Sequence, residues 1–189
     1  MSAFRPIRHV EARWAPVEGE GLEHFTIRAV DGGYHVSSVV IGAGVDGREF
    51  GLSYEVDIDP QWLVKAFAIR RLDGRTLSAR SPERGQWLGS DGSQLLALDG
   101  TIDIDCAFTP FTNTLVVRRN AFALGEVREF TMFYVPADTL EPVTDGQRYT
   151  CLEANHFLYE ATDGGFTATI LFDEHGLVAD YPGLYRRIS

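Results

Sequence analysis

Apolar and polar residues alternate along much of the chain. Between residues 50 and 58 every second side chain is apolar, and glycine, serine, glutamate or aspartate stands between them. A period of two places alternate side chains on opposite faces of a β-strand. Alternating or continuous apolar segments predict roughly ten to fourteen strands, among them residues 22–30, 34–41, 50–58, 62–72, 75–81, 87–88, 94–98, 114–124, 128–135, 149–161 and 166–172.

Asp-Gly dipeptides separate many of these segments. Both residues tolerate the positive φ of tight hairpin turns, so repeated Asp-Gly pairs favour antiparallel strands. Two short stretches, residues 102–108 and 183–188, are the candidates for helical turns. We therefore expect an all-β protein with a single, strongly curved antiparallel sheet that forms an incompletely closed β-barrel, and one or two short helices. The seven pairs lie at residues 31–32, 46–47, 73–74, 91–92, 99–100, 145–146 and 163–164.

The length and net charge of the chain limit its expected number of domains and its expected partners. A chain of 189 residues without a linker predicts one domain over residues 1–189. Its net charge of −10 disfavours nucleic acid and anionic membrane surfaces as partners. No apolar run approaches the ~20 residues of a membrane span. The start lacks the apolar stretch of a signal peptide and there are only two cysteines, Cys106 and Cys151, so we expect a cytoplasmic protein.

The sequence offers weak signals for cofactors and metals. Residues 42–47 fit the dinucleotide fingerprint G-x-G-x-x-G, but a strand pattern follows where that fingerprint needs a helix. We interpret this segment as a hairpin loop and expect no cofactor. Two Asp-Ile-Asp triplets, residues 57–59 and 103–105, could each chelate a divalent metal or form an acid/base couple. Capping of backbone N–H groups in turns is the favoured interpretation, so we predict no metal site.

Two adjacent arginines, Arg118 and Arg119, lie in the predicted strand 114–124. Neighbouring residues of a strand face opposite ways, so one guanidinium would point to the concave side of the sheet. A buried arginine requires a carboxylate or an anionic ligand. The candidate partners within the chain are Glu23, Asp103 and Asp105. Alternatively, both arginines fasten loops at the rim of the sheet.

Large aromatic side chains are the candidates for the wall of a pocket. Aromatic rings pack against acyl chains and sugar C–H groups, while Tyr O–H and Trp N–H groups bind a polar head. Ordinary core packing is the alternative for each of them. The residues are Trp14, Tyr54, Trp62, Trp87 and Tyr159.

The run TPFTNTLVVRRNAFALGE, residues 109–126, follows LDGTIDIDC and resembles the signature of the bacterial putative glycolipid-binding family. The chain departs from that signature at Val116 and Asn120, where the family usually has proline and leucine. The resemblance implies an incompletely closed barrel similar to the lipoprotein-localisation factors, which hold acyl chains in an apolar hollow. It extends over Arg13-Trp14, residues 21–23, Tyr54, Asp59, Trp62, Gly85, Trp87, residues 173–178 and residues 180–182.

Together these features predict non-enzymatic binding of a glycolipid or similar amphiphile in the concave hollow. The expected apolar wall consists of Phe50, Tyr54, Trp62, Phe67 and Trp87. The expected polar end combines Arg118 or Arg119 with Glu23, Asp103 and Asn113, and the remaining candidate ligand-binding residues are Arg13, Trp14, Asp105 and Tyr159.

Two other functions remain open. A small-molecule hydrolase or isomerase would use Glu23 or the Asp103/Asp105 pair against an arginine-bound anionic group. No nucleophile motif is present, so no catalytic residue is assigned. An interaction protein would pair through a sheet edge or an apolar patch. We expect a monomer or a weak homodimer.

Overall fold

The computed structural model describes residues 4–44 and 47–189. Within these residues, fourteen strands form one sheet, accompanied by one α-helix and one short 3-10 helix. The strands of the N-terminal half are β1 (His9–Pro16), β2 (Leu22–Val30), β3 (Gly33–Ala43), β4 (Glu49–Ile58), β5 (Val64–Arg71), β6 (Thr76–Arg80) and β7 (Leu88–Gly89). The C-terminal half contains β8 (Ile104–Cys106), β9 (Val127–Val135), β10 (Val143–Glu153), β11 (His156–Ala161), β12 (Thr167–Phe172), β13 (Val178–Tyr181) and β14 (Tyr185–Arg187). The helices are η1 (Leu96–Leu98) and α1 (Thr112–Arg119).

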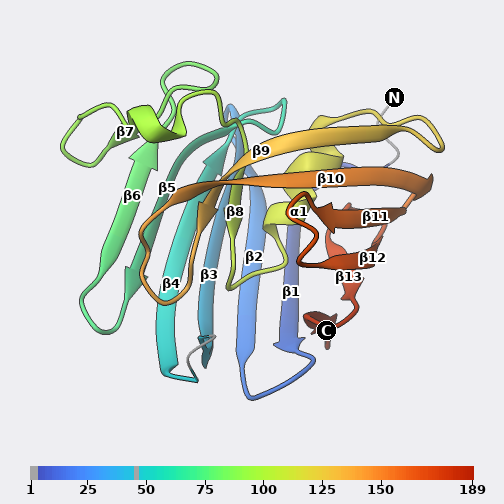
Figure 1. The fold of residues 1–189 in the computed structure, drawn as a ribbon, viewed down its shortest axis with the longest axis horizontal. Coiled ribbons are helices and arrows are strands. Elements are labelled where there is room, and N and C mark those ends of the chain that lie inside the picture. The colour runs from blue at the N-terminus through green and yellow to red at the C-terminus, as the bar shows by residue number, and fades with distance from the viewer. Residues whose placement is uncertain (1–3, 45–46) are drawn as a thin grey trace.

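The sheet is open, and the two ends of the chain join its halves. Its strand order is β7-β6-β5-β4-β3-β2-β1-β14-β13-β12-β11-β10-β9-β8, so β7 and β8 are the edges. Strand β1 pairs with β14 through Trp14 and Arg187. Figure 1 shows β9 and β10 running crosswise to the N-terminal strands, which curves the sheet around its interior. The predicted all-β fold with one large curved sheet is confirmed.

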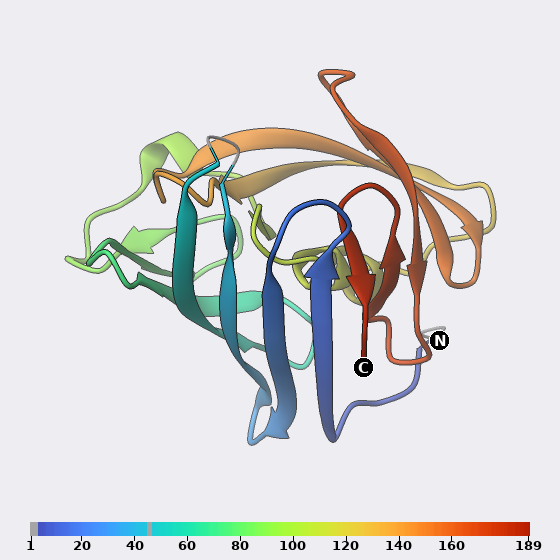
Figure 2. The ribbon, with the colours of Figure 1, turned by 90° about the horizontal axis from the view of Figure 1, so that it is seen from below.

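One pair of strands departs from the expected antiparallel arrangement. Strands β8 and β9 are parallel, with Ile104 beside Phe133. A parallel pair needs a crossover connection, which is usually helical. Helix α1 provides that connection here. In Figure 2 it lies within the curve of the sheet.

Helix α1 fills the centre of the concave side. Leu115 belongs to a core cluster that also includes Phe25, Phe67 and Trp87 of the N-terminal half. Val116 and Val117 belong to a second cluster, with Tyr149, Phe157 and Phe172 of the C-terminal half. The helix therefore packs against both halves at once, and the interior is divided into smaller spaces.

Several local predictions are wrong. Residues 114–119, predicted as strand, belong to α1, because burial on both sides outweighs the weak helix propensity of Thr and Val. Residues 102–108 contain β8 and residues 183–188 contain β14, where helical turns were expected. Residues 94–98 hold η1 in place of a strand.

The Asp-Gly prediction succeeds at most positions. The glycines at positions 32, 74, 92, 100 and 164 all have positive φ and lie in turns or bends. The pair at 145–146 is different, since it lies within β10. Asp46 lies outside the described residues, so the 42–47 loop is seen only in part.

Candidate functional site

Glu23 provides a buried carboxyl group at one end of the concave side. It lies on the inner face of β2, next to Phe25 and Ile27, and is only 2% exposed. Its Oε1 atom accepts hydrogen bonds from Tyr54 Oη at 2.6 Å, Ser38 Oγ at 2.8 Å and Thr109 Oγ1 at 3.0 Å. Its Oε2 atom is buried and has no hydrogen-bond partner within the described residues.

Burial controls the protonation of this carboxyl group. Removal from water raises the pKa of Glu23 to about 7, and the three hydroxyl donors oppose this rise because they stabilise the ionised form. Glu23 can therefore gain or lose a proton near neutral pH. Burial and the neighbouring Glu23 charge raise the pKa of Tyr54, which therefore stays protonated as a donor.

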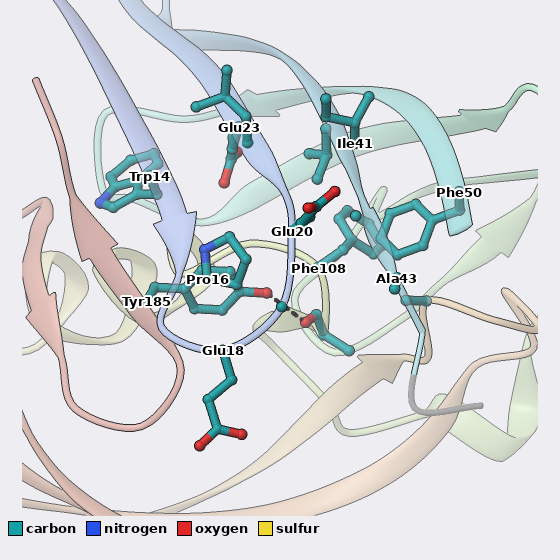
Figure 3. Close-up of a pocket in the computed structure, with 16 residues that line it drawn as sticks. Trp14, Pro16, Glu18, Glu20, Glu23, Ile41, Ala43, Phe50, Phe108 and Tyr185 are labelled. Atoms are coloured by element: carbon teal, nitrogen blue, oxygen red, sulfur yellow. Dashed lines mark hydrogen bonds between the residues drawn. The ribbon is translucent and has the colours of Figure 1, made fainter. Parts of the chain in front are cut away.

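The carboxyl group faces a small cavity. Its volume is about 110 Å³, and apolar side chains such as Trp14, Phe50 and Phe108 line it together with Tyr185. In Figure 3 the Glu23 carboxyl group is directed into the space between Trp14 and Phe108. We call this space the Glu23 pocket.

The Glu23 pocket adjoins a wider hollow at the rim of the sheet. The two spaces share the lining residues Glu20, Ile41, Gly42, Ala43 and Phe50. The hollow has a volume of about 690 Å³ and also includes Glu49 and Leu72, which is 89% exposed. A mainly apolar surface with two glutamates therefore leads from solvent to a buried carboxyl group. We call the wider space the rim hollow.

A second chamber lies on the inner face of the C-terminal half. It has a volume of about 510 Å³, and its lining includes Asp105, Asn113 and Tyr159. Ala107 and Tyr185 line both this chamber and the Glu23 pocket. Tyr185 Oη donates a hydrogen bond of 2.9 Å to the Ala107 carbonyl, so the two shared residues are bonded to each other.

Four of the candidate residues from the sequence, including Phe50 and Glu23, gather around the Glu23 pocket, and three line the second chamber. Trp14 lines the pocket and Tyr54 bonds to Glu23. Around the chamber, Asp105 accepts hydrogen bonds from Thr112 at 2.8 Å and Gln147 at 2.6 Å. Burial raises the pKa of Asp105.

The two arginines do not occupy the expected positions. The prediction that they face opposite sides of a strand is wrong, because both belong to the last turn of α1. Arg119 forms a buried ion pair with Asp103, with Nε 3.1 Å from Oδ1. Arg118 stacks on Trp62 at 4.4 Å and donates to the carbonyls of Arg5 and His175. Neither arginine lines the Glu23 pocket.

Other candidate residues lie in the core or on the outer surface. Phe67 and Trp87 pack against Phe133, with ring centroids 5.3 and 5.0 Å away, and line none of the three spaces described above. The Trp87 indole N–H donates to the Thr101 carbonyl. Arg13 is exposed and bonds to His24.

Sequence reasoning missed two partners of Glu23. Ser38 lies on the inner face of β3 between Val36 and Val40, and a small polar residue at an inward position was the available signal. Thr109 opens the TPFTNT run, but nothing in the pattern relates it to a residue 86 positions earlier. Both contacts depend on tertiary structure.

The first Asp-Ile-Asp triplet, residues 57–59, makes local structural contacts. Asp59 Oδ1 accepts from the backbone N–H groups of Gln61 and Leu63, as expected for capping. Asp57 contacts His35 at 2.7 Å. Within residues 4–44 and 47–189, no group of three or more His, Cys, Asp or Glu side chains is placed to hold a metal ion.

No helix in the described part of the chain is long and apolar enough to cross a bilayer.

Comparisons with known proteins agree with this architecture. A crystal structure of a DUF1089-family protein from Pseudomonas aeruginosa matches with a TM-score of 0.78 and 35% sequence identity, over 98% of this chain and 95% of that chain. No curated protein matches the chain. Residues 11–187 match the family described as "Putative glycolipid-binding". This match spans nearly the whole sheet, from β1 to β14, and the chain belongs to that family.

Proposed function

We propose that this protein binds an amphiphile, with the polar end of the ligand in the Glu23 pocket and the apolar part in the rim hollow. Membership of a family described as glycolipid-binding supports a binding role in general. The observation that carries the proposal is the Oε2 atom of Glu23, which is buried and without a partner within the described residues at the inner end of an apolar-lined space.

When Glu23 is ionised, its unpartnered oxygen favours a ligand that donates a hydrogen bond. Leaving a buried acceptor unsatisfied costs about 1–3 kcal/mol, which a ligand hydroxyl would recover. Because Oε1 already accepts three hydrogen bonds, the ligand would contact Oε2. A sugar hydroxyl has the required chemistry. The polar end proposed here consists of a carboxyl group and three hydroxyls, without the arginine expected from the sequence.

The size of the two spaces supports an extended ligand. A cavity of about 110 Å³ is smaller than the ~300–1,000 Å³ of typical ligand sites, so it holds only one end of the molecule. The remainder would lie along Phe50 towards Ile41 and Leu72 in the rim hollow. Each methylene group buried there adds about 0.8 kcal/mol before ordering costs.

Binding of octyl glucoside below its critical micelle concentration tests this proposal. At pH 8, where Glu23 is mainly ionised, we expect saturable binding by isothermal titration calorimetry, weakened at least about tenfold by Glu23→Gln, because the amide cannot offer the same charged acceptor. Glu11→Gln, which changes an exposed residue of β1, is the matched control and should bind as the wild type does.

Leu72→Asp tests the apolar part separately. It should weaken octyl glucoside binding, but not the weaker binding of methyl glucoside, because only the octyl chain reaches the rim hollow. The proposal would be refuted if octyl glucoside still bound and neither Glu23→Gln nor Leu72→Asp changed its affinity.

Acid/base catalysis is less well supported than binding. The Asp103 carboxylate forms an ion pair with Arg119, and the Asp105 carboxylate accepts hydrogen bonds from Thr112 and Gln147. Of the three candidate carboxylates, Glu23 alone has an oxygen without a partner among the described residues. A hydrolase or isomerase would therefore depend on Glu23 without an arginine-bound anion beside it.

The proposed compartment is the cytoplasm, and the proposed state is a monomer or weak dimer. Cys106 and Cys151 are both free and buried, which suits a reducing compartment. Sedimentation of dilute protein tests the oligomeric state, and a stable dimer at micromolar concentration would contradict it.

A further inference from the structure

The second chamber has a continuous aromatic wall. The rings of Tyr159, Phe166 and Tyr181 contact one another, with centroid separations of 6.1 Å, 6.0 Å and 6.0 Å. Tyr134 of β9 lines another part of the chamber. With Tyr185, five aromatic residues therefore line one space of about 510 Å³, a volume typical of ligand sites.

The chamber also contains unused hydrogen-bonding groups. Tyr159 and Tyr181 are only 7% and 5% exposed, yet neither hydroxyl makes a hydrogen bond within the described residues. Both residues line the chamber and their hydroxyl oxygens are not among the buried ones, so the two hydroxyls can bond to a ligand that enters it.

The charge of the chamber is negative and uncompensated. Asp105, Asp145 and Asp163 line it, and no Arg, Lys or His does. The Asp145 side chain makes no hydrogen bond or ion pair within the part of the chain that the structure describes. The charge of Asp145 contributes to the raised pKa of Asp105, after the larger effect of burial. A positive guest would relieve the repulsion between these carboxylates.

We propose that the second chamber binds an organic ammonium ion, with its charge near Asp105 and Asp145 and its alkyl groups against Tyr159 and Tyr181. Ammonium groups are attracted to the faces of aromatic rings, and aromatic cages bind them in other proteins. This site adjoins the Glu23 pocket, since Ala107 and Tyr185 line both, but its carboxylates and its other aromatic residues belong to the chamber alone. It does not depend on amphiphile binding there.

The direct test compares choline with 3,3-dimethyl-1-butanol, which has the same shape but no charge. Isothermal titration calorimetry of the full chain, at constant ionic strength, should show saturable binding of choline at one site. The neutral analogue should bind at least about tenfold more weakly, because it lacks the attraction to the carboxylates and ring faces. Equal affinity for the two compounds, or no binding of choline, would overturn the proposal.

Two further probes separate possible sources of the ammonium group. Phosphocholine carries a phosphate, as a lipid headgroup does, and should bind more weakly than choline because no cationic side chain lines the chamber. Equal or tighter binding of phosphocholine would contradict recognition by the negative charge of the chamber. Saturable glucose binding without choline binding would assign the chamber to neutral sugars and refute the proposal.

Asp145→Asn locates the site. This half-buried residue has no partner to lose within the described residues, so the variant should fold, which circular dichroism would verify. It should weaken choline binding at least about fivefold, because it removes a charge–charge attraction in a partly enclosed cavity. Asp31→Asn makes the same charge change in the exposed turn after β2 and should leave affinity within twofold of the wild type. A folded Asp145→Asn variant with unchanged affinity would contradict the assignment.

Discussion

At the scale of single residues, the most unusual group is the carboxyl of Glu23. It is enclosed by apolar side chains, but three hydroxyls from β3, β4 and the segment before α1 converge on one of its oxygens. A carboxyl group retained only for stability would have both oxygens satisfied, or an apolar residue in its place. The unused Oε2 therefore indicates a role in binding.

Glu23 should make the stability of the protein depend on pH. Its pKa of about 7 in the folded chain lies above the ordinary value of 4.5, so between these values the native state holds a proton that the unfolded state releases. The free energy of unfolding should therefore fall as pH rises from 4.5 through 7. The contribution of Glu23 to this fall is about 3 kcal/mol, since one pKa unit corresponds to about 1.4 kcal/mol.

Urea unfolding of the wild type and Glu23→Gln between pH 4.5 and 8 measures this contribution. Asp103 and Asp105 also have raised pKa values and add a slope of the same sign, so the difference between the two proteins isolates Glu23. We expect a flatter profile for Glu23→Gln and an unchanged slope for the exposed control Glu11→Gln. Parallel profiles for the wild type and Glu23→Gln would show that Glu23 is not buried as described.

The ion pair between Arg119 and Asp103 is a second prediction at this scale. Arg119→Met should destabilise the protein by about 3 kcal/mol or more, because it leaves a buried carboxylate without its partner. Arg148→Met removes an exposed arginine that pairs with Glu129 and should cost no more than about 1 kcal/mol. Similar losses for the two variants, measured by urea unfolding, would contradict the buried placement of Arg119.

At the scale of elements, helix α1 determines the shape of the interior. Leu115→Ala should cost about 2–5 kcal/mol, because Leu115 is fully buried between the helix and the N-terminal half. Leu124→Ala, at a residue that is 77% exposed, should change stability by about 0.5 kcal/mol or less. Chemical denaturation measures both, and a small loss for Leu115→Ala would mean that α1 does not fill the centre.

Sequence reasoning recovered most of the long strands, but it missed β1, β8, β13 and β14, and it missed this helix for a physical reason. Residues 50–58 alternate cleanly because β4 has one inner and one outer face. Residues 112–117 are buried on every side, so neither a period of two nor a helical period is visible, and their Thr and Val residues favour strand. The incorrect strand then placed Arg118 and Arg119 on opposite faces.

The candidate site could be predicted from the sequence only in part, because the contacts that form it depend on tertiary structure. Glu23 was a candidate as the carboxylate partner of an inward-facing arginine, and the structure places it on the inner face of β2 with hydroxyl partners instead. Its partners Ser38 and Tyr54 depend on the pairing of β2, β3 and β4, and Thr109 on the segment that leads into α1. Strand register and the course of a connection are not encoded in local pattern.

At the scale of the whole molecule, we expect the two halves of the sheet to unfold as one cooperative unit. Strands β1 and β14 join them, Trp14 Nε1 donates to the Val178 carbonyl across the join, and α1 packs against both. We expect the unfolding transitions followed by tryptophan fluorescence and by circular dichroism to coincide. All three tryptophans belong to the cluster of the N-terminal half, so an independent C-terminal half would unfold at a different urea concentration.

The crystal structure of the complex with octyl glucoside is the most direct test of the account. We expect a sugar hydroxyl within hydrogen-bond distance of Glu23 Oε2 and the octyl chain along Phe50 towards Leu72. A detergent molecule bound elsewhere, with the Glu23 pocket filled only by water, would contradict the central claim that this carboxyl group receives the polar end of an amphiphile.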